Sequence, residues 1–498
     1  MSRTRTIFSL KAVNNRAKKV VERRENKYLA AKREGSLNTL NIAANTCKHP
    51  DQILTLATLG SGRDADIRVN GRDISRIHCA FVINHKTGVV LLEDRSQGRT
   101  RLYNHPQQPT SIIDQPKVHP RAVVMDGVNP WLVLGKDLKD PIKFEIKFNL
   151  GVTDTMAIVQ RRISGAAESV LRRNLVTFPG QTPKYENKRI VHSITAELGR
   201  GAFGKVFKTV DVYSGDFLAV KQMSGRPEND RSRDREIRLL SRNNHPHVMS
   251  LLGYYISPRD GTTELFMHMQ RGALDNLLWD TNSRTQVVDI GNAVLIQALS
   301  GLDYLAHRGI IHRDIKPDNI LYDIDHLGNY IFKLSDFGVS NTVEDAWSPA
   351  GTFIYMAPEV RDSSERQTPK VDVYSLFVTM LFVFDVQQFR SRIFSGEFDD
   401  NIRVRKAVLL ASVGDPDVQH MRDMAIYDQT ARASAAQMLA AYGRSDLITP
   451  HFGRPVEALP GGHFDAWIRG VYEGYSPFSD DILDLMELPR NRRPRHGP

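Results

Sequence analysis

The chain has 498 residues, a hydrophobic fraction of 41% and a formal net charge of +10, which at roughly 150 residues per domain allows about two to four domains. Its two cysteines, Cys47 and Cys79, exclude a disulfide framework and a four-cysteine zinc site, and they fit a reducing compartment. The most apolar run, residues 373–386, is too short for a membrane span and contains Asp385. We therefore expect a buried helix there and no membrane association.

Both ends of the chain are basic. Residues 1–34 carry eleven Lys or Arg against three Glu, and residues 489–495 read PRNRRPR. Such runs are usually solvated tails, and nuclear import is the more specific interpretation. We expect the protein in the nucleus, or otherwise in the cytoplasm. Because no nucleic-acid-binding module is visible behind the basic runs, we expect no direct nucleic-acid partner.

Changes in composition divide the chain into five parts. Short β-rich runs at 53–56, 80–83, 89–92 and 131–134, separated by turn signals, predict an all-β sandwich. Strand-rich and then helix-rich patterns follow in the second half. The expected parts are a basic N-terminal segment at 1–48, the sandwich at 49–149, a linker with some helix at 150–190, a mixed α and β domain at 191–445, and a C-terminal extension at 446–498.

A glycine-rich loop opens the fourth part. Gly199, Gly201 and Gly204, followed by Val206, match G-x-G-x-x-G-x-V, a spacing that dinucleotide-binding folds also use. Strand-like residues, with Leu198 directly before the first glycine, lie on both sides, so the loop joins two strands. Glycines in such a loop let the backbone close over triphosphate oxygens, with Val206 against an adenine ring, and this indicates ATP as the ligand.

A lysine and an acid follow the loop at suitable positions. Lys221 ends the run Leu-Ala-Val-Lys, directly after Ala219 and Val220, and it would point at the α- and β-phosphates. Its ammonium group needs an acid to hold it in place. Glu236 lies in a helical pattern and is our choice, whereas the nearer Glu228 belongs to a polar stretch.

The segment IHRDIKPDN at 311–319 supplies the catalytic residues. Asp314 is the predicted base that accepts the proton of a substrate hydroxyl, and Lys316 would neutralise the migrating phosphoryl group. Asn319 and Asp336, the latter in Ser-Asp-Phe-Gly, offer the oxygen ligands that Mg²⁺ prefers. The alternative, that these are surface turn residues, is disfavoured because five elements match in order.

On these residues the chain resembles the eukaryotic protein kinase family over 192–445, and KPDN at 316–319 is similar to the serine/threonine branch. The resemblance implies an α+β bilobal fold and protein substrates. It also implies a hinge at Met267 and Met269 with Phe266 as gatekeeper. Two further implied roles are a pair between Glu359 and Arg432, and an Asp372 that ties the catalytic loop to a central helix.

The resemblance also implies regulation by phosphorylation. Arg313, before the catalytic aspartate, implies a cationic pocket that a phosphate on the activation segment would neutralise. Thr342, Ser348 and Thr352 are the hydroxyl candidates, with Thr352 alternatively a structural residue beside Asp314.

Substrate preference follows from the same resemblance. Ala273 stands where arginine-directed relatives carry a glutamate, and a second acid near the catalytic loop is shortened to Asp318. A strict arginine preference is therefore not expected.

The predicted sandwich resembles the forkhead-associated (FHA) domain. Gly62-Arg63 and then Ser75-Arg76-Ile77-His78 carry the resemblance, because Arg63, Ser75 and Arg76 would donate charge-assisted hydrogen bonds to a phosphothreonine. His78 is expected to brace two loops. The chain departs from the family at 98–100, where Gly-Arg-Thr replaces Asn-Gly-Thr, and Arg99 offers a further phosphate contact.

A multidomain chain with an FHA sandwich followed by a bilobal kinase is similar to the checkpoint kinase 2 family and its meiotic relatives, which act in DNA-damage or recombination signalling. Residues 1–49 lack the Ser-Gln and Thr-Gln cluster of checkpoint members, which favours a meiotic or divergent member. The main hypothesis is an ATP- and magnesium-dependent serine/threonine kinase that docks on phosphothreonine proteins or associates with another copy of itself. The alternatives are a silent scaffold that binds phosphoproteins and an FHA domain used only for intramolecular control.

Overall fold

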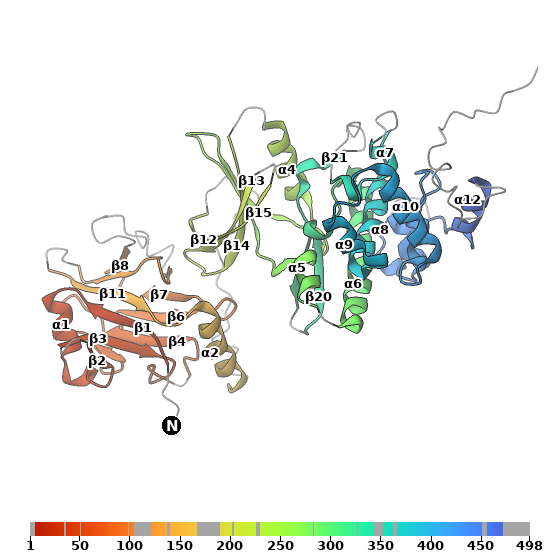
Figure 1. Cartoon of the computed structure of the whole chain (residues 1–498). Coiled ribbons are helices and arrows are strands. Elements are labelled where there is room, and N and C mark those ends of the chain that lie inside the picture. Colours follow the sequence, from red (N-terminus) through yellow and green to blue (C-terminus); the bar gives the residue numbers. More distant parts are fainter. Residues whose placement is uncertain are drawn as a thin grey trace, which may run out of the picture. The chain divides into compact units, whose positions relative to one another are not determined.

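The chain forms two compact units (Figure 1). The first comprises Met1–Gln222, Leu252–Ser257 and Thr263–Met269, and the second comprises Met223–Leu251, Pro258–Thr262 and Gln270–Pro498. The computed structural model describes residues 5–33, 36–49, 51–97, 99–103, 121–136, 140–166, 190–201, 204–225, 230–281, 283–325, 327–342, 352–361, 366–450 and 456–471.

The first unit begins with a sandwich of two β-sheets. One sheet has the strand order β2-β3-β1-β11-β10-β8 and the other has the order β5-β4-β6-β7-β9, with β4 and β5 parallel and the other pairs antiparallel. The strands are β1 Thr6–Ala12, β2 Ala30–Arg33, β3 Ser36–Ala43, β4 Thr55–Gly60, β5 Ile67–Arg68, β6 Cys79–Ile83, β7 Val90–Asp94, β8 Thr100–Tyr103, β9 Arg121–Val124, β10 Trp131–Leu134 and β11 Ile142–Phe148. The four β-rich runs predicted from the sequence thus contribute β4, β6, β7 and β10.

The basic N-terminal segment is part of this sandwich, which corrects the expectation of a separate segment at 1–48. β1 lies between β3 and β11 in the six-stranded sheet, and the helix α1 (Asn15–Val21) and the short helix η1 (Arg24–Asn26) follow it. Within β1, Phe8 and Leu10 are buried whereas Ser9 and Lys11 are not. The alternation of a strand was present, but the density of Lys and Arg concealed it.

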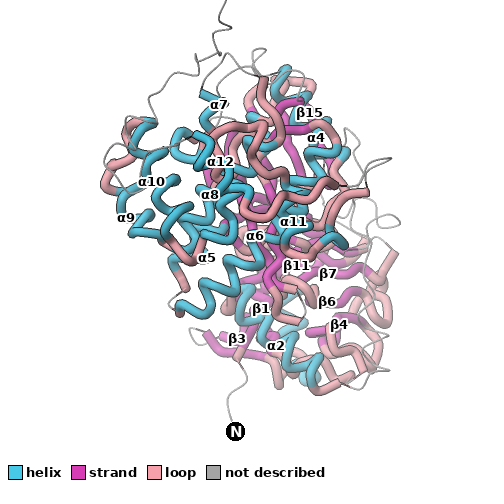
Figure 2. Tube along the Cα trace, turned by 90° about the vertical axis from the view of Figure 1, so that its right-hand side faces the viewer, coloured by secondary structure: helices cyan, strands magenta, loops and turns pink. Residues whose placement is uncertain are grey.

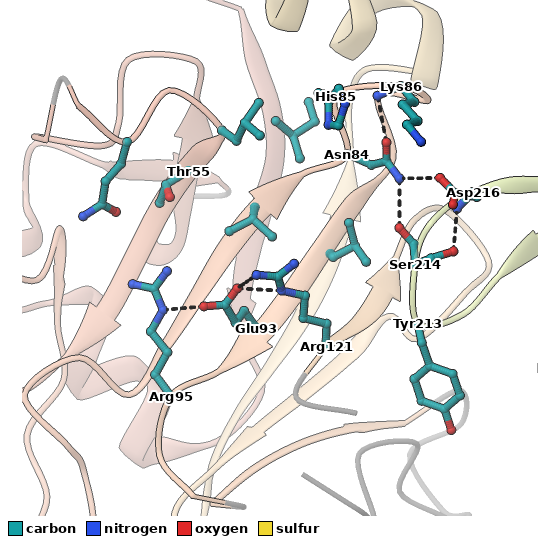
Figure 3. A pocket seen from close by; sticks show the side chains of 15 residues that line it. Thr55, Asn84, His85, Lys86, Glu93, Arg95, Arg121, Tyr213, Ser214 and Asp216 are labelled. Atoms are coloured by element: carbon teal, nitrogen blue, oxygen red, sulfur yellow. Dashed lines mark hydrogen bonds and ion pairs between the residues drawn. The ribbon is translucent and has the colours of Figure 1, made fainter. Parts of the chain in front are cut away.

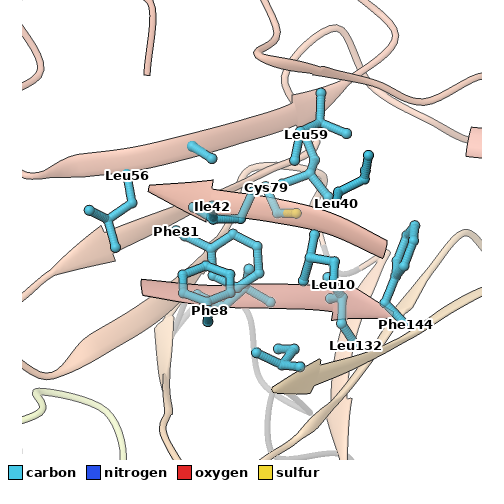
Figure 4. Close-up of a cluster of buried hydrophobic side chains, with 14 of the residues drawn as sticks. Phe8, Leu10, Leu40, Ile42, Leu56, Leu59, Cys79, Phe81, Leu132 and Phe144 are labelled. Carbon is cyan, nitrogen blue, oxygen red and sulfur yellow. The ribbon is translucent and has the colours of Figure 1, made fainter. Parts of the chain in front are cut away.

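The core of the sandwich is built from both sheets (Figure 4). Phe8 from β1 contacts Phe81 from β6 with ring centroids 4.7 Å apart. Leu40, Leu132 and Phe144 from the six-stranded sheet belong to the same buried cluster as the residues of the five-stranded sheet. Apolar contact of this kind between two inner faces is what holds a β-sandwich together.

The helix expected within the linker is present. α2 (Val152–Ser164) packs on the sandwich, where the Arg162 guanidinium donates to the main-chain oxygens of Ile53 (2.7 Å) and Thr55 (3.1 Å). The rest of the expected linker, residues 167–189, lies outside the described residues.

The remaining part of the first unit is a five-stranded sheet. Its order is β12-β13-β14-β16-β15, and the antiparallel pairs β12–β13 and β13–β14 make it a continuous meander at one edge. Its strands are β12 His192–Gly201, β13 Gly204–Asp211, β14 Phe217–Met223, β15 Leu251–Ile256 and β16 Thr263–His268.

The second unit is mostly helical after α4 (Figure 2). Its helices are α4 Asp230–Arg242, α5 Leu274–Trp279, α6 Arg284–His307, α7 Pro358–Arg361, α8 Lys370–Phe384, α9 Phe389–Phe394, α10 Asn401–Gly414, α11 Ala435–Ala441 and α12 His463–Val471. Shorter elements are β17 Gly272–Ala273, β18 Ile310–Ile311, η3 Pro317–Asn319, β19 Ile320–Ile324, β20 Tyr330–Leu334, η4 Phe337–Val339, β21 Asn341–Thr342, η5 Phe353–Tyr355, η6 Val386–Gln388, η7 Gln419–Met424 and η8 Ser445–Leu447.

The apolar run at 373–386 lies largely in the helix α8, and the predicted buried helix is confirmed. Every residue from Val371 to Phe384 is buried. Among the described residues, no single helix has the length and apolar composition to cross a membrane, and α8 meets that test only together with the helical segment 386–394, from which it is bent by 104°.

Part of the C-terminal extension folds back on the second unit, an outcome that the sequence left open. Phe464 of α12 packs with Leu409 of α10 and with Ile426 in one buried cluster. Asp465 pairs with Arg422 at 2.5 Å, and the His463 ring lies 2.7 Å from the Ala431 carbonyl oxygen. Residues 472–498 lie outside the described residues.

Candidate functional site

A buried aspartate of α8 fixes the backbone of the predicted catalytic loop. The Asp372 carboxylate accepts hydrogen bonds from the main-chain N–H groups of His312 (2.7 Å) and Arg313 (2.8 Å). Burial raises the pKa of Asp372, and the positive charges and N–H groups of these two residues oppose that rise. The bonds hold Arg313 at φ 68°, a left-handed conformation that is uncommon for a non-glycine residue. The expected tie between Asp372 and the loop is confirmed.

Three of the predicted residues contact the Asp314 carboxylate. Its Oδ1 accepts from the main-chain N–H and from the Oγ1 hydroxyl of Thr352, both at 2.8 Å. Its Oδ2 accepts from Asn319 Nδ2 at 2.8 Å and lies 2.9 Å from Lys316 Nζ. Lys316 Nζ also donates to Thr352 Oγ1 at 2.6 Å. The carboxylate is therefore held in one orientation from both sides.

Thr352 lies beside Asp314, the position that its expected structural role requires. Its hydroxyl accepts from Lys316 and donates to Asp314, so it links the base to the neighbouring cation. Of the other two hydroxyl candidates, Thr342 lies in β21, whose backbone pairs with β18 through Ile310↔Thr342. Ser348 lies outside the described residues.

The two predicted magnesium ligands are brought together by Ser335. Its main-chain N–H and its hydroxyl both donate to the Asn319 carbonyl oxygen at 2.9 Å. His312 also holds Ser335 in place, because its Nε2 lies 2.9 Å from the Ser335 carbonyl oxygen. Asp336 follows at φ 59° and caps η4 by accepting from Gly338 N–H at 3.4 Å. The Asn319 amide thus stands beside Asp314, and Asp336 directly follows the serine that bonds to Asn319.

The donor set fits a hard cation that takes its other ligands from a phosphate group. Amide and carboxylate oxygens suit Mg²⁺, which usually binds through one or two protein groups plus substrate phosphates and water. In the part of the chain that the structure describes, no cluster of three or more His, Cys, Asp or Glu has the arrangement of a metal site. An all-protein metal cage is therefore not the arrangement found among these residues.

The glycine-rich loop connects two antiparallel strands, as predicted. β12 and β13 pair up to Gly201↔Gly204, where Gly204 has φ 145°. Residues 202 and 203 lie outside the described residues. At Gly199 a Cβ would meet nothing within 4 Å, so the backbone is open to a ligand on that side. Leu198 beside it is 48% exposed.

The predicted nucleotide-binding side chains lie on neighbouring strands of the same sheet. Val206 of β13 is the cross-strand partner of Lys221 on β14, and Lys208 is the partner of Ala219. Lys221 is buried. Phe266, in β16, is fully buried, whereas Met267 and the following Met269 are half-buried. Glu236, on α4, is buried within the second unit, so its pairing with Lys221 stays a prediction.

The predicted phosphopeptide residues occupy two adjoining loops of the sandwich. Ser61 N–H donates to the Ser75 oxygen and Gly62 N–H to the Arg76 oxygen, each at 2.9 Å. A Cβ at Gly62 would lie 2.9 Å from that Arg76 oxygen, so glycine permits the close approach. Arg63 and Arg76 are both exposed, and Arg76 pairs with Asp64 at 2.9 Å.

His78 braces these loops, as predicted. It is fully buried, its Nδ1 accepts from Ser75 N–H at 3.2 Å, and its Nε2 lies 3.3 Å from the Arg99 carbonyl oxygen. Burial lowers the pKa of His78, which favours the neutral ring that this arrangement requires. Arg99 is thereby held at the same end of the sandwich as Arg76.

Sequence reasoning missed Arg235, which directly precedes Glu236 on α4. Burial lowers the pKa of Arg313 and the positive charge of Arg235 lowers it further, whereas Asp372 opposes both effects. Arg313 also donates from Nε to the Val339 oxygen at 2.8 Å, at the start of the activation segment. The signal in the sequence is the position of Arg235 directly before Glu236 in the same helical pattern.

Comparisons with known proteins agree with this geometry. The family model described as protein kinase domain matches residues 192–442, and the model described as FHA domain matches residues 57–116. The LRR receptor-like serine/threonine-protein kinase FEI 2 of Arabidopsis thaliana is 37% identical over 226 residues, which cover 42% of this chain and 36% of the relative. The serine/threonine-protein kinase TAO2 of Homo sapiens is 37% identical over 191 residues, which cover 37% of this chain and 15% of the relative.

A crystal structure of Rad53 residues 1–466 in complex with AMP-PNP shares the fold, with a TM-score of 0.51 and 19% identity, over 83% of this chain and 98% of that one. The fold class is therefore an FHA sandwich followed by a bilobal kinase, as the sequence predicted. This chain spans only 15% to 36% of the length of the two curated relatives named above. With its kinase-domain match over half of its length and an FHA domain before it, the chain belongs to the protein kinase family, and its kinase domain is of the serine/threonine type.

Proposed function

We propose that this protein transfers the γ-phosphoryl group of ATP to serine and threonine hydroxyls of other proteins. The observation that carries the proposal is the arrangement around Asp314, in which Thr352, Asn319 and Lys316 fix both carboxylate oxygens. Positioning and electrostatic stabilisation supply most of the catalysis in phosphoryl transfer. A base held this firmly needs no reorganisation when a substrate hydroxyl arrives.

Each residue has a separate part in the reaction. Asp314 accepts the proton of the substrate hydroxyl, and Lys316 neutralises charge on the phosphoryl oxygens as they move towards the acceptor. Asn319 and Asp336 hold Mg²⁺, and Lys221 binds the phosphates, with Glu236 orienting it. The nucleotide base lies among Leu198, Val206, Ala219, Met267 and Met269. Magnesium-bound ATP supplies the phosphoryl group and the charge compensation for its transfer.

The FHA loops bind phosphothreonine in this proposal. Arg63 and Arg76 are exposed, and Ser75 lies beside them on a loop that His78 holds rigid. The Arg76–Asp64 pair is exposed and therefore weak, so a phosphate competes for this guanidinium at little cost. Gly98 stands where the family has its asparagine, and Arg99, directly after it, adds a cation at the same end of the domain.

Such a kinase is suited to DNA-damage or meiotic recombination signalling in the nucleus. The order of FHA domain and kinase domain supports this proposal, together with the basic residues 489–495. Binding of one copy's phosphothreonine by another would raise the effective concentration for phosphorylation in trans. Fluorescence imaging of the tagged chain with and without Arg492 and Arg493 would test nuclear import, and retention of nuclear signal without them would contradict this role of the tail.

The first experiment compares the wild type with Asp336→Asn. Both are incubated with magnesium and ATP, and new phosphates are mapped by mass spectrometry. Phosphate on the wild type alone supports the proposed site and reveals the activating residue. Equal phosphorylation of both proteins contradicts the assignment of Asp336, and no phosphate on either, even with protein substrates added, favours the silent scaffold.

The FHA proposal needs its own measurement. A peptide pool with a fixed phosphothreonine and randomised flanks is passed over the immobilised full chain, beside the Arg63→Ala variant and an unphosphorylated pool. We expect retention only of the phosphorylated pool on the wild type. Equal retention on both proteins would exclude Arg63 as a phosphate ligand, and a kinase rate that changes in Arg63→Ala without any peptide retention would favour purely intramolecular control.

A further inference from the structure

The five-stranded sheet of the FHA sandwich is apolar on both of its faces. Along β7, Val90 and Leu92 belong to the sandwich core, whereas Leu91 between them belongs to a second buried cluster. Val82 of β6 and Val123 of β9 join Leu91 in this second cluster. Neighbouring strand residues point to opposite faces, so these three side chains lie on the outer face of the sheet. An outer face that met water would carry polar residues instead.

The turn between β13 and β14 covers this outer face. These two strands belong to the sheet β12-β13-β14-β16-β15, which we call the small lobe of the kinase. Val210 is fully buried in the second cluster, and Phe217 packs against it. Gly215, at φ 74°, forms the tip of the turn, and a Cβ there would lie 3.3 Å from Leu91 and 3.4 Å from Val89. The turn therefore fits against the sheet with little space between them.

Polar contacts fix the turn at a defined position (Figure 3). Asn84 Nδ2 donates to the Ser214 carbonyl oxygen at 2.8 Å and to Asp216 Oδ1 at 3.0 Å. Thr87 Oγ1 donates to the Gly215 carbonyl oxygen at 2.7 Å. These contacts join residues about 130 positions apart, and a cavity of about 240 Å³ lies beside them. The hydrogen bonds give the docked turn a specific register as well as apolar burial.

The connection between β13 and β14 also covers an edge of the five-stranded FHA sheet. Among the residues that the structure describes, β9 pairs only with β7 and is the last strand in its sheet. Val123 N–H, on the outer side of β9, donates to the Val212 carbonyl oxygen of the small lobe at 2.7 Å, and the Val123 oxygen accepts from Asn129 Nδ2 at 2.8 Å. Unpaired groups on an exposed edge strand promote aggregation, so the small lobe covers a surface that would be unfavourable if the domain were alone.

The docked turn is remote from both predicted ligand loops along the strands that connect them. β6 begins directly after His78, beside the phosphopeptide loops, and ends at Ile83 before Asn84, which is about 16 Å for five residues at 3.3 Å each. β13 begins at the glycine-rich loop and ends at Asp211, which is about 26 Å for eight residues. Docking thus leaves both ligand loops uncovered.

We propose that the outer face of β6, β7 and β9 is an intramolecular docking surface that permanently holds the β13–β14 turn, so that the FHA domain and the kinase small lobe act as one body. The phosphopeptide loops and the glycine-rich loop project from the two ends of this body and can be occupied together. The docking itself does not depend on phosphothreonine binding.

Hydrogen exchange of the full chain at residue resolution tests the docking. In the wild type we expect the Val123 amide to be protected, because it donates to the Val212 carbonyl oxygen of the small lobe. Gly215→Val pushes a side chain against Leu91 and should accelerate that exchange about tenfold or more. Gly328→Val is the matched control, since Gly328 is also a turn glycine with positive φ but has open space around it.

The hydrogen bond between Asn84 and Asp216 provides a second, independent test. Asn84→Asp places a carboxylate beside Asp216, and Asp216→Asn in the same chain restores a donor between the two side chains. We expect faster Val123 exchange in the single variant and recovery in the double variant, while Asn70→Asp, at an exposed position outside the strands, has no effect. Exchange of the core amides Leu56 and Leu59 reports whether each variant stays folded.

Two results would overturn the proposal. An unprotected Val123 amide in the wild type, or unchanged Val123 exchange in both Gly215→Val and Asn84→Asp, would show that the turn is not docked. Addition of the phosphothreonine peptide pool should slow exchange in the loops around Arg63 and Arg76 and leave Val123 unchanged. Faster Val123 exchange on peptide binding would show that the two surfaces exclude each other.

Discussion

Arg432 and Glu359 form a bidentate ion pair that is completely buried in the second unit. Arg432 Nη1 donates to Glu359 Oε1 at 2.5 Å and Nη2 to Oε2 at 3.0 Å, and both side chains are 0% exposed. The guanidinium also donates to the Ile426 carbonyl oxygen at 2.7 Å and lies 5.0 Å from the centre of the Tyr374 ring. This confirms the predicted pairing and ties the end of the activation segment to the helical core.

Removal of Arg432 should destabilise the second unit strongly. Arg432→Ala leaves the Glu359 carboxylate buried without its cation, which costs about 3–5 kcal/mol. Urea unfolding followed by far-UV circular dichroism would measure the loss. Arg444→Ala is the control, because its pair with Asp446 is largely exposed, so that solvent screens it and its loss should change stability little. Equal losses in the two variants would contradict the structural role of the buried pair.

The Thr352 hydroxyl should affect turnover more than nucleotide binding. Thr352→Val removes the bridge between Asp314 and Lys316, and a lost hydrogen bond to charged groups, worth about 1.5–3 kcal/mol, lowers kcat about 10- to 100-fold. KM for ATP should stay near the wild-type value, and Thr352→Ser should keep most of the activity. Steady-state kinetics with a protein substrate would measure these values.

An acidic substitution at Thr352 distinguishes a structural role of this residue from a regulatory one. Thr352→Asp puts a second carboxylate beside Asp314, so we expect an inactive enzyme even after treatment with an activating kinase. An increase in activity would instead make Thr352 a phosphorylation site whose negative charge activates the enzyme.

The catalytic part of the fold was predictable because its residues form short motifs with fixed spacing. Asp314, Asn319 and Asp336 lie within a 23-residue stretch, and the short antiparallel pair β19–β20 between Asn319 and Asp336 brings these two residues close in space. Glu359 and Arg432 are 73 positions apart and were paired only through the family resemblance. β1 was missed because strand alternation over seven residues is a weak signal inside a basic run.

The docking of the FHA sheet on the small lobe could not be predicted from the sequence. Asn84, Thr87 and Gly215 are ordinary turn residues, and each satisfies local turn geometry by itself. Their contacts arise only after two domains have folded and met. The apolar outer face was readable in principle, since Val89, Val90, Leu91 and Leu92 form a continuous apolar run, which is typical of a strand that is covered on both faces.

Arg235 should support activation by phosphorylation. Arg235 and Arg313 place two positive charges near each other, and each lowers the cost of binding a phosphate from the activation segment. Arg235→Gln should reduce the rate of the phosphorylated enzyme about 10- to 100-fold, which corresponds to about 1.5–3 kcal/mol for a charge-assisted contact. The unphosphorylated enzyme should be unaffected. Arg238→Gln, exposed on the same helix, is the control, and equal effects of the two changes would point to a general charge effect.

His245 should make the stability of the second unit depend on pH in the acidic range. Its ring stacks on Tyr304 with centroids 4.8 Å apart, and its Nδ1 accepts from the His247 main-chain N–H at 3.2 Å. Burial, followed by the positive charges of His247 and Lys333, lowers the pKa of His245 to about 4 from its ordinary value of 6.5. Protonation would remove the acceptor for the His247 N–H and place a charge in a half-buried position.

The direction of this pH effect follows from proton binding. Between the two pKa values the unfolded chain holds a proton on His245 that the folded chain lacks, so stability rises with pH across this window and levels off above it. We expect His245→Gln to reduce the slope of unfolding free energy against pH between 4 and 6.5. The reduction is at most about 1.4 kcal/mol per pH unit, and less because solvent screens a partly exposed ring. Urea unfolding at several pH values would measure it, with His307→Gln at an exposed position as the control. Parallel curves for the wild type and His245→Gln would show that His245 binds its proton equally in both states.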